Sequence, residues 1–232
     1  MVTISKRVRE NKKKIDRRKE HSLEEGVAVL KKLAPAKFNE TVEISIRLGV
    51  DPKKADQVVR GTVALPHGTG KTVRVLAITK TKQSEAESAG ADLVGFEDVI
   101  EKIKGGWTDT DVIVATPEAM PEIGKLGKIL GPRGLMPNPK AGTVTPNIGQ
   151  AIHEIKAGKV EFRVDKTGIL HLGIGKIAFS EQQLRDNLTE LFRNVMRLKP
   201  ASAKGQYVKS VFLSSTMSPG IKLTRAVVEG VK

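Results

Sequence analysis

The sequence predicts two domains of different class: an α+β domain built from both chain ends, and an α/β domain inserted between them. Three patterns predict this: apolar and polar residues alternate in strands near both ends, short apolar strands alternate with helices in the middle, and the basic excess lies at the ends. An antiparallel sheet with one solvated face produces the first pattern, and a parallel sheet covered on both faces produces the second. We therefore expect a split two-layer domain with an antiparallel sheet at residues 1–67 and 159–232, and an inserted three-layer, Rossmann-like domain at residues 68–158.

The composition excludes several functional classes. The 232 residues include 39% hydrophobic residues, enough for real cores, and no cysteine, which excludes disulfides and thiolate metal sites. The four histidines are scattered without ligand spacing, and no apolar run is long enough to span a bilayer or to form a secretory signal. We expect a cytoplasmic protein with no metal, no cofactor and no membrane partner.

The net charge of +14 predicts a polyanionic partner, and its distribution says which part binds it. Residues 1–67 and residues 159–232 each carry a net charge of +7, whereas residues 68–158 are neutral. The predicted split domain therefore holds the whole excess.

The N-terminal segment is the most basic part of the chain. Residues 6–19 contain nine basic residues, and only Val8 and Ile15 are apolar, which leaves no evident face for packing. We expect a mobile basic arm that contacts a polyanion; a solvated charge run is the alternative.

A helix and a strand follow the arm. Ser22 with Glu25 three residues later predicts a capping box, and apolar residues then recur at helical spacing until Pro35. Residues 41–48 alternate polar with apolar side chains, which predicts a strand with one buried face.

Residues 66–71, with the sequence PHGTGK, predict a hinge at the entry to the insertion. Gly70, Lys71 and Thr72 match the end of a phosphate-binding loop, but Leu65 stands where the first glycine of that motif belongs. The apolar strand also follows these glycines instead of preceding them. This is weak support for nucleotide binding.

The insertion alternates strands and helices, the pattern of a parallel sheet. We expect strands at residues 73–78, 91–94 and 111–115, and helices at residues 83–89, 96–104, 118–130 and 147–157.

Residues 124–145 form the stretch least compatible with a regular element. They contain five glycines, three prolines and four basic residues but no acid, so we expect one defined winding path. It serves either as a structural elbow or as a phosphate-contacting surface. Arg133 and Lys140 are its candidate contacts with tRNA or rRNA.

The C-terminal part returns to alternating strands. Residues 160–164 and 169–174 are joined by a tight turn at residues 165–168, which predicts a hairpin. Ser180 and Gln183 predict a capping box for a helix that ends before Pro200. A strand at residues 207–213 then leads into SSTMSPG.

No catalytic constellation is evident, and His171 is interpreted as a structural histidine in preference to a base. With one Trp and one Tyr in the chain, stacking on an aromatic platform is not the general mode, so backbone contact and shape must carry more of any RNA recognition. Phe38, beside Lys37, is the exception: its ring either packs on RNA or is buried under the preceding helix. The hydroxyls of residues 214–218 either meet ribose and phosphate groups or form an ordinary polar turn.

Four motifs, LPHGTGK, GKILGPRGLMPNPKAGTVT, KVEFRVDKTG and SSTM, resemble in this order the family of bacterial large-subunit ribosomal protein L1, the protein of the mobile rRNA stalk. The resemblance covers nearly the whole chain. It implies a non-catalytic protein, monomeric outside the ribosome, whose split domain binds stalk rRNA beside the exit site where deacylated tRNA leaves. It also implies repression of the protein's own operon through binding of its mRNA.

The family's RNA-contacting patch corresponds here to Phe38, Thr216 and Met217. The predicted RNA-binding set also includes Lys37, Arg163, Lys166, Thr167, Ser214 and Ser218. Ser218 stands where the family usually has glycine, and it is strained if that position needs a positive φ. Two alternatives to this function are a nucleotide-binding enzyme that uses the insertion and a nonspecific RNA chaperone.

Overall fold

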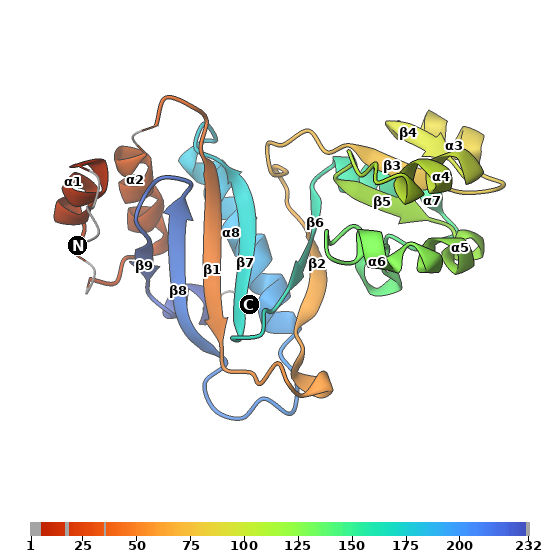
Figure 1. The fold of residues 1–232 in the computed structure, drawn as a ribbon. Helices are drawn as coiled ribbons and strands as arrows, with labels where there is room; N and C mark the ends of the chain where they lie inside the picture. Colours follow the sequence, from red (N-terminus) through yellow and green to blue (C-terminus); the bar gives the residue numbers. More distant parts are fainter. Residues whose placement is uncertain (1–5, 17–18, 35, 231–232) are drawn as a thin grey trace. The chain divides into compact units, whose positions relative to one another are not determined.

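The computed structural model describes residues 6–16, 19–34 and 36–230. Its contacts divide the chain into two compact units, Met1–Lys71 with Val160–Lys232 and Thr72–Lys159 (Figure 1). We call them the split unit and the insertion. The fold combines an antiparallel sheet and a parallel sheet, which confirms the predicted mixed class. No helix in the described ranges is long and apolar enough to cross a membrane.

The split unit is built on a four-stranded antiparallel sheet with the strand order β7-β1-β8-β9. The strands are β1 (Thr41–Leu48), β7 (Ile169–Lys176), β8 (Val208–Ser215) and β9 (Ile221–Leu223). Every second side chain of β1, from Val42 to Leu48, is buried, so the predicted half-buried strand is confirmed. β9 was not predicted, because its three residues are too few to show a period.

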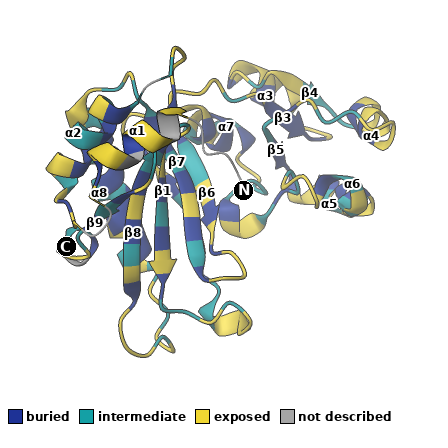
Figure 2. Cartoon of the chain, turned by 60° about the vertical axis from the view of Figure 1, so that its left-hand side comes forward, coloured by how far each residue is buried: buried dark blue, intermediate teal, exposed yellow. Residues whose placement is uncertain are grey.

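Two helices, α2 (Leu23–Leu33) and α8 (Glu181–Arg197), pack with the sheet in one hydrophobic core. Ser22 accepts the Glu25 N–H at 3.2 Å at the start of α2. At the start of α8, Ser180 and Gln183 form the complete capping box. Figure 2 shows buried and exposed residues alternating along β1, β7 and β8. The face of the sheet that points away from this core, which we call the open face, therefore carries exposed and half-buried side chains.

The basic N-terminal segment is helical, which corrects the expectation of an unpacked mobile arm. Helix α1 (Lys6–Lys14) buries Asn11, whose Nδ2 donates to Leu33 O at 3.5 Å, and Ile15 joins the core just after it. Asn11 and Ile15 therefore both attach this segment to the split unit. Part of the predicted arm, residues 17–18, lies outside the described residues.

The hairpin predicted at residues 160–174 is wrong in its pairing, although its turn is present. β6 (Lys159–Arg163) pairs with β2 (Arg60–Ala64) in a separate two-stranded sheet, while β7 pairs with β1. The backbone hydrogen bonds on the two sides of the turn go to different segments. Val164 N donates to Val59 O before the turn, and Gly168 O accepts from Leu48 N at its end. Each strand thus finds its partner in the N-terminal part of the chain.

Helix α8 also anchors the connection that leads to the insertion. Asn187 is fully buried; its Oδ1 accepts the His67 N–H at 3.0 Å, and its Nδ2 donates to Gly68 O at 3.0 Å and Ile174 O at 2.8 Å. The first half of the predicted hinge is therefore tied to the split unit. Thr72 is followed by β3 instead of a helix, so the phosphate-binding-loop resemblance lacks the helix N-terminus that binds phosphate.

The insertion contains a three-stranded parallel sheet in the order β4-β3-β5, formed by β4 (Leu93–Gly95), β3 (Val75–Ile78) and β5 (Val112–Ala115). Every residue of β3 is buried, and alternate residues enter two different cores. α3 (Gln83–Ser88) and α7 (Ile148–Lys156) pack in one core, and α4 (Glu97–Lys104), α5 (Met120–Lys125) and α6 (Gly127–Leu130) pack in the other. The predicted three-layer arrangement is confirmed.

One predicted helix of the insertion is interrupted. In place of one helix over residues 118–130, the chain forms the 3₁₀ helix η2 (Pro117–Ala119), α5 and α6, with a break at Leu126 between two glycines, Gly124 and Gly127. Glycine lowers helix stability, so short helices that bury Ile123, Leu126 and Leu130 replace one continuous helix. The glycine- and proline-rich stretch at residues 124–145, which we call the Gly/Pro loop, also includes the 3₁₀ helix η3 (Pro139–Ala141). Two further short elements, η1 (Ala55–Gln57) and α9 (Ala226–Glu229), were not predicted from the sequence.

Candidate nucleic-acid interface

The candidate interface lies in the strongly basic unit. The split unit holds the whole net charge of +14, and the insertion is neutral. A polyanion is therefore attracted to the split unit over distances of about a Debye length, roughly 10 Å at 0.1 M salt.

Phe38 projects from the loop before β1 and is 54% exposed, so the alternative that it is buried under the preceding helix is wrong. The loop is fixed by the two residues that directly follow the ring. Asn39 Oδ1 accepts the Ala178 N–H at 3.2 Å, and Glu40 O accepts the Ile177 N–H at 2.9 Å. Lys37 is exposed beside the ring. An apolar ring held in solvent in this way is available to pack on a base or ribose.

The turn after β8 meets this loop at the first residue of β1. Thr216 N donates to Thr41 O at 3.1 Å, and Thr216 Oγ1 accepts the Thr41 N–H at 3.1 Å. Thr216 remains exposed and Met217 half-buried. The structure thus brings six predicted residues to one end of the β1–β8 pair, and we call them the Phe38 patch: Lys37, Phe38, Ser214, Thr216, Met217 and Ser218.

The hydroxyl of Thr216 has a role that sequence reasoning missed. Because it accepts the Thr41 N–H, replacing Thr216 with Val removes a bond inside the protein as well as any bond to RNA. A weakened Thr216→Val variant therefore does not by itself demonstrate a direct RNA contact.

Ser218 is not strained, which corrects the expectation attached to this position. Within the described ranges no residue other than glycine has a positive φ. Instead, Ser218 Oγ accepts the Ser215 N–H at 2.8 Å and donates to Pro219 O at 3.2 Å. The hydroxyl supplies a hydrogen bond within the turn that a glycine at this position cannot make.

The remaining predicted residues of the split unit form a second group, the turn cluster: Arg163, Lys166 and Thr167. Arg163 is exposed on β6, and Lys166 and Thr167 lie on the turn at residues 165–168. Asp165 organises the turn: its carboxylate accepts the Ile169 and Thr167 N–H groups, each at 2.8 Å, and the Thr167 hydroxyl. Its bonds to Ile169 and Thr167 lower the pKa of Asp165 below its ordinary value.

The Phe38 patch and the turn cluster lie at opposite ends of β1. The turn reaches the far end through the bond from Leu48 N to Gly168 O, at 2.8 Å. The first and last of the eight residues of β1 are seven steps apart, about 23 Å at roughly 3.3 Å per step. Sequence reasoning placed them in one set without this separation.

The open face lies between the two groups and adds side chains that were not predicted. Ser45 on β1 is opposite His171 on β7 and Phe212 on β8, and Phe212 is 38% exposed. The Ser45 Oγ and His171 Nδ1 atoms lie 3.0 Å apart, consistent with the structural interpretation of this histidine. The alternation of β1 that predicts its buried residues also identifies Ser45 as a residue of the open face. The side chains of Phe212, His171 and Ser45 thus lie between the Phe38 patch and the turn cluster.

The Gly/Pro loop belongs to the insertion and follows a defined path. Leu135 N donates to Leu130 O at 3.1 Å, and Asn138 N donates to Thr143 Oγ1 at 2.8 Å. Leu135 and Met136 pack against a core of the insertion, which leaves Arg133 and Lys140 exposed. The loop therefore presents two cations on a fixed backbone.

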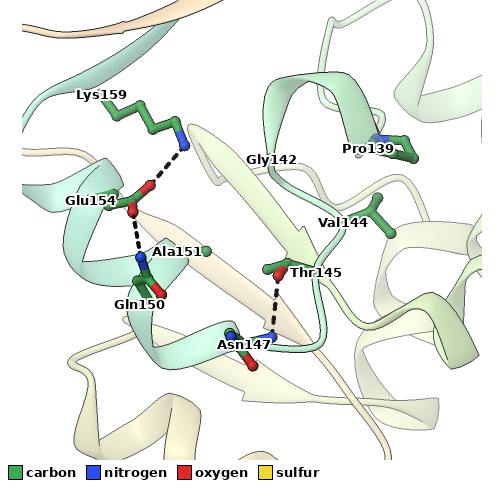
Figure 3. Close-up of a pocket in the computed structure, with 9 residues that line it drawn as sticks. All are labelled: Pro139, Gly142, Val144, Thr145, Asn147, Gln150, Ala151, Glu154 and Lys159. Atoms are coloured by element: carbon green, nitrogen blue, oxygen red, sulfur yellow. Dashed lines mark hydrogen bonds and ion pairs between the residues drawn. The ribbon is translucent and has the colours of Figure 1, made fainter.

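The insertion also contains a polar cavity of about 280 Å³ along one side of α7 (Figure 3). Lys159 Nζ contacts Glu154 Oε2 at 2.7 Å, and Gln150 Nε2 donates to Glu154 Oε1 at 2.9 Å. These bonds, first that from Lys159, lower the pKa of Glu154. Its carboxylate is held ionised by its own neighbours, so it is a poor proton donor.

Comparison with known proteins identifies the family. The model of the ribosomal protein L1p/L10e family matches residues 30–219. Large ribosomal subunit protein uL1 of Flavobacterium psychrophilum is 55% identical over 224 residues, covering 96% of this chain and 98% of that protein. The protein of the same name from Chlorobium luteolum is 58% identical and covers 91% of this chain and 93% of its own length. That from Parabacteroides distasonis is 55% identical and covers 93% of this chain and 94% of its own length. The match of the family model over most of the sequence, together with this identity, shows that the chain belongs to the ribosomal protein L1p/L10e family.

Proposed function

We propose that this protein is a non-catalytic component of the large ribosomal subunit in the cytoplasm, and that its split unit binds stalk rRNA. The observation that carries the proposal is Phe38, held exposed in the loop before β1 in the unit that has all the net charge. The matched relatives are named as ribosomal proteins and not as enzymes, so the nucleotide-binding alternative is set aside.

Affinity for RNA and preference for a particular RNA come from different side chains of the split unit. Lysine and arginine side chains of the turn cluster and of α1 neutralise phosphates, which gives affinity without sequence preference. The Phe38 ring and the neighbouring hydroxyls act only at short range and depend on RNA geometry. RNA that spans about 23 Å and fits both groups is preferred over random RNA.

The test is a binding comparison between a stalk rRNA fragment and a random RNA of equal length, across a series of salt concentrations. We expect both dissociation constants to rise steeply with salt because counterions are released on binding. The preference for the stalk fragment, at least about tenfold, should persist because shape contacts release few ions. Equal binding of both RNAs at every salt concentration would instead support the nonspecific chaperone.

We further propose that the split unit folds and binds without the insertion. All residues of its core lie before residue 66 or after residue 159, and β2 pairs with β6 where the chain leaves and returns. Residues 1–67 joined by a short linker to residues 159–232 should bind the stalk fragment within about threefold of the intact protein, because all the net charge is retained. The isolated insertion, residues 68–158, should bind weakly. A joined protein that is folded by circular dichroism but does not bind would contradict this proposal.

The finer parts of the function rest on the family resemblance. We propose that the protein, a monomer outside the ribosome, lies beside the exit site, assists release of deacylated tRNA and represses its own operon by binding its mRNA. The repressor role requires that a leader transcript of the operon compete with the stalk fragment. Arg133 and Lys140, the exposed cations of the Gly/Pro loop, are the residues proposed to contact tRNA or rRNA.

A further inference from the structure

A buried carboxylate lies between the two segments that form the Phe38 patch. Glu40 is 1% exposed, although it directly follows the exposed loop that carries Phe38. Its Oε1 accepts the Ala36 N–H at 3.0 Å. Its Oε2 accepts the Ser215 hydroxyl at 2.6 Å and the Met217 N–H at 3.0 Å.

These bonds join two parts of the chain that are 175 or more residues apart. Burying an ionised carboxylate is unfavourable unless hydrogen bonds compensate for the lost water, and bonds to a charged acceptor are stronger than neutral ones. One oxygen holds the loop before β1, and the other holds the turn after β8. The carboxylate therefore fixes the distance between those two segments.

We propose that Glu40 is a positioning residue for RNA recognition, a role that rests on the function proposed above. Its carboxylate sets the place of Phe38 relative to Met217 while remaining out of contact with the RNA. Ala36 lies two residues before the Phe38 ring, and Met217 is itself part of the patch. Loss of the carboxylate frees both segments, and binding must then order them again at a cost in conformational entropy.

A carboxylate suits this position better than an amide. Glutamine has almost the same shape but presents N–H groups where Glu40 has an acceptor oxygen. The Ser215 hydroxyl can rotate to accept from that amide, whereas the Met217 N–H cannot reverse its role. The amide has only one acceptor oxygen, so in either orientation Glu40→Gln leaves one of the two N–H donors, that of Ala36 or that of Met217, facing an NH2 group, with the least change in volume.

The experiment compares Glu40→Gln with Glu181→Gln, which removes the same charge from an exposed site in the first turn of α8. We expect Glu40→Gln to weaken binding of the stalk rRNA fragment by about 10- to 100-fold. Binding of random RNA should change by less than about twofold, since losing an acid does not reduce attraction to phosphate. Glu181→Gln should bind both RNAs like the wild type. Stalk binding by Glu40→Gln within about twofold of wild type would overturn the inference.

Two further readouts separate positioning from general loss of structure. In amide NMR spectra of the free protein, the Met217 and Ala36 signals should move in Glu40→Gln, while those of Ile44 and Leu213 in the sheet stay in place. Unmoved Met217 and Ala36 signals would overturn the inference. Combined with Phe38→Ala, Glu40→Gln should give a loss smaller than the product of the two single effects, because both act through the same ring. A loss equal to that product would also overturn it.

A milder variant covers the case in which Glu40→Gln does not fold. Ser215→Ala removes one bond but leaves the carboxylate with its two N–H donors, so we expect a loss of about three- to tenfold in stalk binding. Unchanged binding by folded Ser215→Ala would overturn the inference in that case. If the wild-type protein shows no preference for the stalk fragment, the proposed function is wrong. If the wild-type protein shows the preference and Glu40→Gln retains it, only the role of Glu40 is wrong.

Discussion

Replacing Phe38 with alanine is expected to weaken binding of the stalk rRNA fragment by about 10- to 100-fold, because stacking of one base on an aromatic ring contributes roughly 1–3 kcal/mol. The ring is more than half exposed, so the free energy of unfolding should change by less than about 0.5 kcal/mol. Random RNA and the salt dependence should be unaffected, because no charge is lost. Filter binding with both RNAs, together with thermal denaturation of the free protein, measures these quantities.

Leu93→Ala is the matched control for this variant. Leu93 is 43% exposed on β4 of the insertion, so its truncation also removes exposed apolar surface but leaves the Phe38 patch intact. We expect wild-type binding of both RNAs. Full-strength stalk binding by stably folded Phe38→Ala would place the recognition surface elsewhere, and equal losses in both variants would indicate a nonspecific effect.

The second large effect concerns stability. Asn187→Ala should lower the free energy of unfolding by about 2–4 kcal/mol, because it leaves the His67 N–H and the carbonyls of Gly68 and Ile174 without their amide partner. Chemical denaturation measures the loss. Hydrogen exchange of the His67 amide should accelerate in the folded protein, since its acceptor is gone.

Asn194→Ala on the same helix is the control. The Asn194 amide donates to Glu190 O and Glu190 Oε1, which are local partners on α8, so the loss should be about 1 kcal/mol or less. Similar destabilisation by the two variants would mean that the contacts of Asn187 between segments add nothing beyond an ordinary helix residue.

The sequence determined which faces are buried. The alternation in β1, the wholly apolar β3 and the helical spacing in α8 each report a local period, and that period depends only on neighbouring residues. The same local rules located the capping box at Ser180 and the turn at residues 165–168. The basic excess of the chain ends is likewise a property of the sequence alone.

Only the tertiary structure decided which strands pair. β6 and β7 are adjacent in sequence and joined by a tight turn, yet each pairs with a strand more than 90 residues away. Local periodicity is the same whether or not two neighbouring strands share a ladder, so it carries no information about the partner. For the same reason the sequence could not show that β1 lies between β7 and β8.

For the candidate site too, the sequence predicted some features and only the tertiary structure showed the others. Residue type and family motifs selected Phe38, Thr216 and Met217, but they left open whether Phe38 is buried and gave Glu40 no role. An acidic residue beside an exposed loop is ordinarily solvated, and only the return of β8 beside β1 encloses this one among the donors of Ala36, Ser215 and Met217. The sequence by itself determined the chemistry of the patch; the tertiary structure decided its geometry, because contacts between residues far apart in the chain depend on packing that no local pattern records.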